Sequence, residues 1–256
     1  EGFKYLNWNF LSEVPSRRAA KAGIGPAMWG SIWACVVCAL VALPLGAGTA
    51  IFLEEFKPKR AWLRKLHGFI QLNITNLAGV PSIVYGILGL TVFVQMFGVF
   101  GNANDTTWKF GTVDDWYYIQ LPFGRGVLAG GLTLMLVTLP IIIISAQEAL
   151  RAVPNSLREG ALAAGATKWQ MVSKMTLPAA IPGIMTGAIL SMSRAIGEAA
   201  PMLIIAGVVY ITFTPSHLMD EFTVMPLQIY SWASLPQEEF HRVAASGIIV
   251  LLAILL

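Results

Sequence analysis

The chain has 256 residues, of which 56% are hydrophobic and only 12% are charged, and its mean hydropathy is +0.67. Soluble chains usually contain about 45–50% apolar and about 25% charged residues. The composition therefore excludes an ordinary soluble globular chain and predicts a polytopic membrane protein of the all-α class.

Four runs are almost free of charge and exceed the roughly 20 residues that a helix needs to cross a bilayer. They cover residues 26–53, 69–104, 126–147 and 179–214. A fifth run, 243–256, has only 14 residues, so we expect the chain to end inside a fifth span. The chain also starts without a signal peptide, and we expect an upstream part to be absent. The predicted organisation is an external segment, 1–25, followed by one transmembrane domain, 26–256.

Basic residues near the runs predict the orientation. The connection after the first run has five Lys or Arg residues, and the connection before Pro178 has four. Connections 105–125 and 215–242 have three between them and are rich in Asp and Glu. Because cytoplasmic loops carry an excess of Lys and Arg, we assign the first pair to the cytoplasm. By alternation residues 1–25 lie outside, although their own basic residues argue against it.

Residues 148–178 form a polar, basic segment between two apolar runs. The segment contains two pairs with capping-box spacing, a glycine at a helix stop and a closing proline, in the order Ser156 with Glu159, Gly165, Thr167 with Gln170, and Pro178. These signals predict two short helices with a left-handed turn at Gly165 between them. We interpret the segment as a rigid docking element that faces a soluble partner.

Several motifs carry no chemistry. Cys35 and Cys38 lie in the middle of an uncharged run, where apolar packing is the expected role. The three histidines have no metal-ligand spacing, and no metal site or catalytic residue is predicted. Gly160 and Gly165 have the spacing of a phosphate-binding loop, but Ala166 stands where lysine is required. We therefore predict no nucleotide site and no cofactor in this chain.

One ionic pair lies within an apolar run. Arg194 and Glu198 are four residues apart, on a helical face that also contains Ser191 and two glycines. A charge at the bilayer centre costs from about 2.5 kcal/mol upward, so such residues usually face a protein interior or a water-filled path. Two interpretations stay open: the pair lines a substrate path, or Glu198 neutralises Arg194 and locks two helices. Pro201 is expected to bend the same helix.

These residues resemble a known family. The segment Glu159-Gly160-Ala161, Gly165 and Met175-x-Leu177-Pro178 is similar to the EAA loop of ABC-importer permeases, with Gly160 in place of alanine and Met175 in place of isoleucine. Four longer segments look like the phosphate-importer permease of the PstA type: GVPSIVYGILGL at 79–90, VPNSLREGALAAGATKWQM at 153–171, GIMTGAILSMSRAIGEAAPML at 183–203 and MPLQIYSWASLPQEEF at 225–240. The string PSIVYG is also similar to the sister PstC type, but residues 199–201 and 228–232 favour PstA.

The resemblance implies a helical bundle of the MetI-like type in the bacterial cytoplasmic (inner) membrane. Permeases of this type have six spans, so the first would be absent here and the last truncated. The chain would form half of the pore of an importer for inorganic phosphate and would not itself be an enzyme. Its implied partners are a second homologous permease subunit, an ATP-binding ABC subunit that holds ATP and Mg²⁺, and an external phosphate-binding protein.

The resemblance also assigns residues to two sites. Leu157, Ala161 and Ala164 share one face of the first loop helix and would enter a groove on the ATPase, with Arg158 and Lys168 at its polar rim. The full docking set is Leu157, Arg158, Glu159, Gly160, Ala161, Ala164, Gly165 and Lys168. The substrate path is assigned to Arg194, Glu198 and Ser191. The alternative for the docking face is that it packs on the spans of the chain itself.

Three questions stay open at this point. The carried solute could be another oxyanion or a small organic molecule. An ion-driven secondary transporter fits less well, because Glu198 is the only carboxylate found within the spans. A membrane-embedded enzyme also fits less well, because Arg194 and Glu198 alone do not supply a nucleophile, an acid–base pair or a metal cluster. The external loop 101–124 contains Trp108, Trp116, Tyr117 and Tyr118, which could form an interfacial belt or contact a binding protein. Residues 225–240 are expected to lie on the membrane surface as an amphipathic segment.

Overall fold

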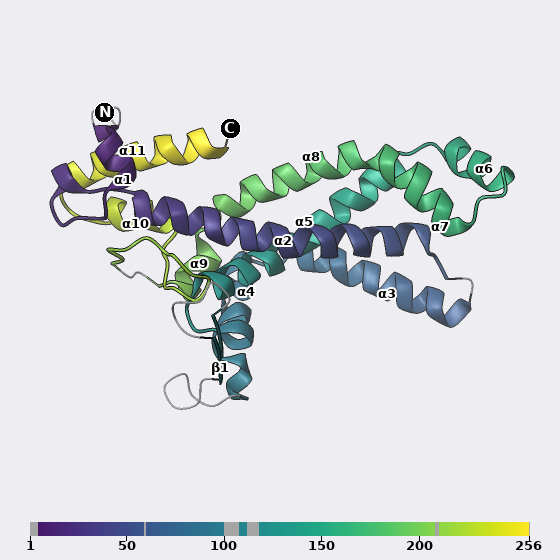
Figure 1. Ribbon diagram of the computed structural model, residues 1–256, viewed down its shortest axis with the longest axis horizontal. Helices are drawn as coiled ribbons and strands as arrows, with labels where there is room; N and C mark the ends of the chain where they lie inside the picture. Colours follow the sequence, from purple (N-terminus) through teal and green to yellow (C-terminus); the bar gives the residue numbers. More distant parts are fainter. Residues whose placement is uncertain (1–4, 59, 100–107, 112–117, 208–209, 256) are drawn as a thin grey trace. The chain divides into compact units, whose positions relative to one another are not determined.

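The computed structural model describes residues 5–58, 60–99, 108–111, 118–207 and 210–255, and most of its regular structure is helical (Figure 1). The chain divides into two compact units: unit 1 is Glu1–Cys38, Pro81–Met135 and Ser193–Leu256, and unit 2 is Ala39–Val80 and Leu136–Met192. Three helices contribute residues to both units: α2 (Gly25–Glu55), α5 (Val127–Arg151) and α8 (Leu177–Ile196).

The described residues contain three helical stretches long and apolar enough to cross a membrane, Gly25–Glu55, Val127–Arg151 and Lys168–Ile196. A fourth is possible only if α3 (Ala61–Ala78) and the helical segment Ser82–Val94 count together as one broken span. The prediction of a membrane-spanning helical bundle is confirmed, with three or four candidate spans in place of about five.

Two predicted runs are interrupted. The run 69–104 breaks after Ala78, and α4 (Ser82–Gly89) begins directly after Pro81, in keeping with the rule that a proline disfavours the helical conformation for the residue before it. The run 179–214 ends as a helix at Ile196, and Pro201 then lies in the first turn of α9 (Ala200–Ile205). Pro201 therefore starts a new helix and does not bend a continuous one, since its missing N–H is unpaired in a first turn anyway.

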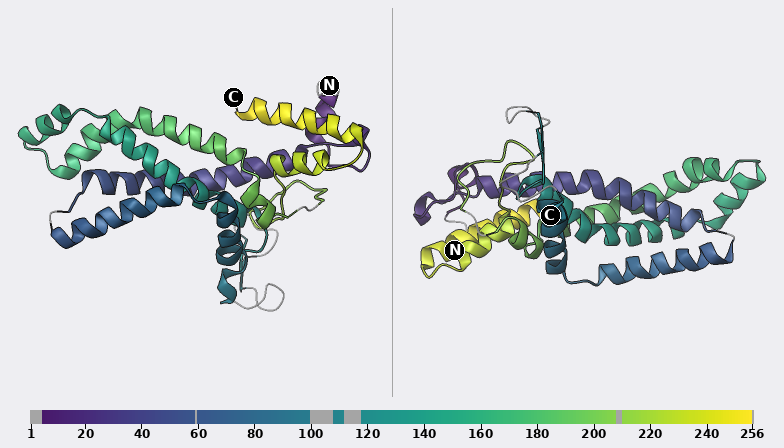
Figure 2. Two further views of the ribbon diagram at one scale, coloured as in Figure 1. Left: turned by 180° about the vertical axis from the view of Figure 1, so that it is seen from behind. Right: turned by 90° about the horizontal axis from the view of Figure 1, so that it is seen from below.

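Unit 1 has an apolar core at its N-terminal segment. This core joins α1 (Trp8–Ser12) and the 3₁₀ turn Ala19–Lys21 to α10 (Met225–Ala233) and α11 (Glu238–Leu255) (Figures 1 and 2). α10 buries Met225, Leu227, Ile229 and Trp232 within the chain and exposes Tyr230, and the location of residues 225–240 on the membrane surface stays a prediction. α11 begins with the charged residues Glu238, Glu239 and Arg242 and is uncharged from Val243 onward.

The rest of unit 1 combines short elements. α4 is followed by a π turn, Leu90–Val94, and a 3₁₀ turn, Met96–Gly98. Strands β1 (Trp108–Phe110) and β2 (Ile119–Leu121) pair antiparallel. Of the four aromatic residues expected in the external loop, Trp108 is exposed and Tyr118 is buried, while Trp116 and Tyr117 lie outside the described residues.

A turn in the second predicted external connection is organised by Asp220. Its Oδ2 accepts hydrogen bonds from the backbone N–H of Ser216 and of His217, at 2.8 Å and 2.9 Å, and from the Ser216 hydroxyl at 3.0 Å. Burial raises the pKa of Asp220, but these hydrogen bonds and the nearby His217 outweigh it, so that the pKa lies below its ordinary value.

Unit 2 contains α3, the ends of α2, α5 and α8, and the segment between α5 and α8. Its core is formed by apolar side chains of these four helices together with Val153, which follows α5: Ala50, Leu53, Ile74, Ile143, Ala146, Leu150, Val153 and Ala180. The segment between α5 and α8 contains α6 (Asn155–Ala163), α7 (Lys168–Met171) and a π turn, Val172–Thr176, and lies near the C-terminal end of α2 (Figures 1 and 2).

Candidate docking element and substrate path

The first helix of the docking element begins without a side-chain cap. Its N-cap is Pro154, and α6 starts at Asn155. Ser156 therefore lies in the first turn, where the predicted capping box with Glu159 does not form. That prediction is wrong because Pro154, with φ −58° and ψ 137°, already sets the entry of the chain into the helix.

The end of α6 matches the prediction. Gly165 has φ +83°, in the left-handed region that side chains with a Cβ disfavour. Its N–H donates to the Leu162 carbonyl at 3.0 Å, and the N–H of Ala166 donates to the Ala161 carbonyl at 3.1 Å. This pair of bonds is the Schellman pattern, which satisfies carbonyls at the helix end and fixes the exit of the chain.

The second capping box is confirmed. The N–H of Gln170 donates to the Thr167 hydroxyl at 3.3 Å, and the Gln170 side chain accepts from the Thr167 N–H at 2.8 Å. The predicted helix end at Pro178 is wrong, because α7 continues through the π turn into α8. Pro178 has no N–H, so it fits where hydrogen bonding changes from the π to the α pattern.

The predicted docking face is divided between surface and interior. Leu157, Glu159, Gly160, Ala164, Gly165 and Lys168 are exposed, whereas Ala161 is buried. Ala161 packs with Met171, Val172, Ile51 and Phe56, so for this residue the alternative of packing on the chain itself is correct. Periodicity alone did not identify Leu162 and Trp169, whose side chains are 48% and 66% exposed.

Arg158 does not lie at an exposed polar rim. Its Nη2 is 2.9 Å from Oε1 of Glu55 at the end of α2, and the two side chains are 17% and 6% exposed. The guanidinium also donates to the carbonyls of Leu150 and Val153, at 2.7 Å each, and to the Asn155 side chain at 3.1 Å. Arg158 therefore satisfies carbonyls at the end of α5 while it neutralises a buried carboxylate of α2.

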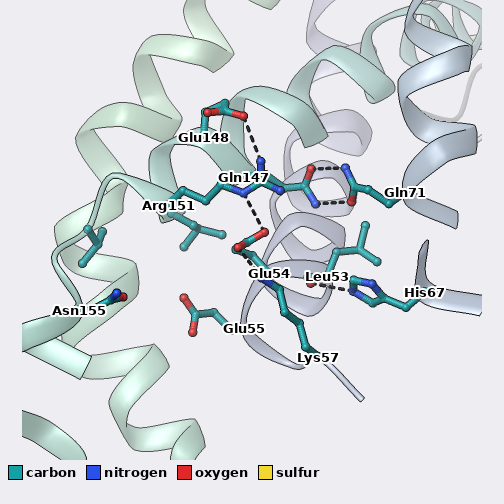
Figure 3. Close-up of polar contacts among 12 residues, drawn as sticks. Leu53, Glu54, Glu55, Lys57, His67, Gln71, Gln147, Glu148, Arg151 and Asn155 are labelled. Carbon is teal, nitrogen blue, oxygen red and sulfur yellow. Dashed lines mark hydrogen bonds and ion pairs between the residues drawn. The ribbon is translucent and has the colours of Figure 1, made fainter. Parts of the chain in front are cut away.

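Further polar contacts surround this pair. Arg151 lies between Glu54 and Glu148, at 3.1 Å and 3.2 Å, and Lys57 is 2.8 Å from Glu54 (Figure 3). A cavity of about 290 Å³ is lined by Glu54, Glu55, Lys57, Arg151, Asn155 and Arg158. The sequence predicted basic residues here but not the two glutamates, because Glu54 and Glu55 stand at the end of an otherwise apolar run.

Two contacts connect α3 to this end of unit 2. The amides of Gln71 and Gln147 exchange two hydrogen bonds, at 2.9 Å and 2.8 Å, and His67 Nε2 lies 2.8 Å from the carbonyl oxygen of Leu53 (Figure 3). Gln147 is only 2% exposed, so its reciprocal pair with Gln71 satisfies a buried polar group.

The ionic pair of the predicted path is present and loose. Arg194 Nε lies 4.0 Å from Glu198 Oε2, with the side chains 59% and 17% exposed. Ser191 is buried, and its hydroxyl donates to the Gly187 carbonyl at 2.8 Å. The small residues of this face pack on α5, since a Cβ at Gly187 would lie 2.5 Å from the hydroxyl oxygen of Ser145. This face of α8 is therefore packed against α5 at Gly187 and exposed at the Arg194 guanidinium.

Among the residues that the structure describes, no three His, Cys, Asp or Glu side chains are grouped as ligands of a metal ion. Cys38 is buried in α2 and Cys35 is partly buried.

Fold and site define a multi-pass helical membrane protein with a capped helical element between two of its spans. A family model described as the inner membrane component of binding-protein-dependent transport systems matches residues 42–256. The chain belongs to this family. It is therefore a permease component of an ABC-type transport system in the inner membrane and not the catalytic subunit.

Curated relatives include permeases with and without a named solute. The chain is 38% identical over 202 residues to the probable ABC transporter permease protein YqgH of Bacillus subtilis, which is 79% of this chain and 56% of that protein. It is 32% identical over 241 residues to the phosphate transport system permease protein PstA of Mycobacterium leprae, covering 90% and 67%. It is 32% identical over 211 residues to the phosphate transport system permease protein PstC of Pasteurella multocida, covering 80% and 62%.

Proposed function

We propose that the chain is a transmembrane permease subunit of an ATP-driven importer for inorganic phosphate. The observation that carries the proposal is the similarity to phosphate permeases of both the PstA and the PstC type over most of the chain. The relative YqgH has no solute in its name, so import of another oxyanion or small solute is the second candidate. In this proposal residues 26–256 form the permease domain and pair with a second homologous subunit.

The proposed docking element is the segment 148–178, which binds a separate ATPase at the cytoplasmic face. Its Schellman turn at Gly165 and its capping box at Thr167 make it rigid. Leu157, Leu162 and Trp169 expose apolar surface on this element, and exposed apolar side chains on a folded element suit contact with a partner protein. ATP and Mg²⁺ belong to the ATPase in this scheme, and the chain needs no cofactor of its own.

The proposed substrate path passes Arg194. The guanidinium is more than half exposed and touches its partner Glu198 only at the 4.0 Å limit of an ion pair, so its donors are available to an anion. A planar guanidinium fork matches the oxygens of phosphate, which favours an oxyanion over a neutral solute. Ser191 belongs to the proposed path only as the buried neighbour of Arg194 in the same helix.

The proposed mechanism is alternating access. Closure of the ATPase dimer moves the docking element as a rigid body, and the spans then change the side of the membrane to which the pore opens. An external binding protein delivers phosphate. The permease residues stabilise the anion electrostatically and perform no covalent chemistry.

The test is purification of the tagged chain from its native membrane, followed by reconstitution into proteoliposomes. We expect an ATPase and a second permease subunit to copurify, and phosphate with its binding protein to stimulate ATP hydrolysis and uptake more than sulfate or molybdate does. Stimulation by a different solute would reject phosphate and keep the importer class. A purified chain that has no ATPase bound would reject the docking assignment.

A further inference from the structure

The docking element is also attached to a helix that is not adjacent to it in sequence. α6 follows α5, and α7 leads into α8, yet the ion pair of α6 is made with Glu55 of α2, which is 103 residues from Arg158 in the chain. Glu55 is almost fully buried. A buried carboxylate of this kind depends on its partner, because removal of one charge leaves the other buried without its ion pair.

A second contact joins the same two parts. Ile51 and Phe56 pack against Ala161, Met171 and Val172. On the outside of this cluster the Phe56 ring lies 6.4 Å from the Trp169 ring and 5.3 Å from the ammonium nitrogen of Lys168. The C-terminal turn of α2 and the residue after it therefore contact both helices of the docking element.

The end of α2 is also connected to α3 and α5. The side chain of His67 in α3 hydrogen-bonds with the Leu53 carbonyl. Four residues further along α3, Gln71 pairs with Gln147 and so joins α3 to α5 (Figure 3). Because hydrogen bonds depend on both distance and direction, these contacts restrict movement of the end of α2 relative to α3 and α5.

We propose that Arg158 is a positioning residue that clamps the docking element to the C-terminal turn of α2, so that both move as one body. The proposal rests on the proposed function in one respect, that an ATPase displaces the element. Arginine suits this role because its planar fork reaches the Glu55 carboxylate and the carbonyls of Leu150 and Val153 at the same time, which a lysine ammonium does not.

The first arm of the test measures the clamp without transport. Spin labels are placed on Gly48→Cys of α2 and Gly160→Cys of α6, where an added Cβ meets no atom within 4 Å, with Cys35 and Cys38 replaced by alanine. In nanodiscs we expect a single narrow distance distribution. Arg158→Gln should broaden it, and Glu55→Gln should broaden it less because the amide still accepts a hydrogen bond. An unchanged distribution in Arg158→Gln would overturn the proposal.

The matched control is Arg151→Gln. Arg151 lines the same cavity and pairs with Glu54, but its side chain is 47% exposed, so its loss should leave the distribution narrow. Broadening in Arg151→Gln equal to that in Arg158→Gln would overturn the assignment to Arg158 and indicate a general loosening of unit 2.

The second arm measures coupling in the purified complex. Arg158→Gln should keep its bound ATPase and lose about tenfold or more of solute uptake per ATP hydrolysed, while Arg151→Gln should lose far less, because Arg151 is the last residue of α5 and lies outside α6 and α7. Loss of the ATPase from Arg158→Gln would contradict the proposal, because Arg158 would then only support the docking surface. If the parent binds no ATPase at all, the proposed function fails while the clamp is still judged by the spin-label distances.

Discussion

Gly165 offers a direct test of the docking element, because its replacement perturbs the backbone and little else. Its φ is +83°, and an added Cβ would meet no atom within 4 Å. Gly165→Ala therefore causes no clash, and its effect comes from forcing a residue with a Cβ into the left-handed region. That strain amounts to about 1–2 kcal/mol.

The consequence follows from the size of this strain. A change of about 1–2 kcal/mol lowers the population of the native turn relative to alternatives roughly 5- to 30-fold. The Schellman bonds at Gly165 and Ala166 would be lost in those alternatives, and the exit direction of the chain toward α7 would change. We expect ATPase association or phosphate-stimulated hydrolysis to fall while the spans still insert.

The assay is copurification of the ATPase and stimulated ATP hydrolysis at matched membrane levels. Gly48→Ala is the control, since Gly48 also has open space at its Cβ position but lies inside α2, where alanine is preferred by about 0.5–1 kcal/mol. Gly165→Asn should fall between the parent and Gly165→Ala, because asparagine tolerates the left-handed region. Equal coupling in Gly165→Ala and Gly48→Ala would refute the reasoning.

Three further predictions address other parts of the chain. The double replacement Arg194→Met with Glu198→Gln should assemble normally and fail to transport; normal phosphate uptake at matched membrane levels would reduce the pair to a structural role. A cysteine at Lys168 should be shielded from an impermeant thiol reagent in intact cells, and one at Gln237 should be labelled; the reverse pattern would invert the orientation. The pKa of Asp220 is lower in the folded turn than in the unfolded chain. The ionised Asp220 carboxylate therefore stabilises the turn fully at pH values above the ordinary pKa of about 3.9. This stabilisation is lost as the pH falls through the lower pKa of the folded state. Hydrogen exchange at the turn amides should rise over that acidic window, and Asp220→Asn should exchange faster than the parent at neutral pH and lose this dependence.

Local sequence signals determined several elements correctly. α2 and α5 follow the uncharged runs at 26–53 and 126–147, because a long apolar segment satisfies its backbone polar groups only as a helix in a bilayer. The left-handed turn at Gly165 and the capping box at Thr167 were also predictable. Each depends on bonds within about five residues, so neighbouring residue types are sufficient to specify it.

Tertiary structure decided what those elements contact. The burial of Ala161 and the pairing of Arg158 with Glu55 arise because α6 packs against the end of α2, a neighbour that helical periodicity cannot identify. The structural role of each proline was also decided by its surroundings. Pro201 lies in the first turn of α9, whereas Pro178 lies where α7 and the π turn continue into α8. The difference arises because the hydrogen bonds available around each proline determine whether a helix starts or continues there. From sequence alone, a basic residue in a loop is predicted to be exposed. Arg158 lies in the interior because Glu55, a carboxylate from a helix distant in sequence, pairs with it.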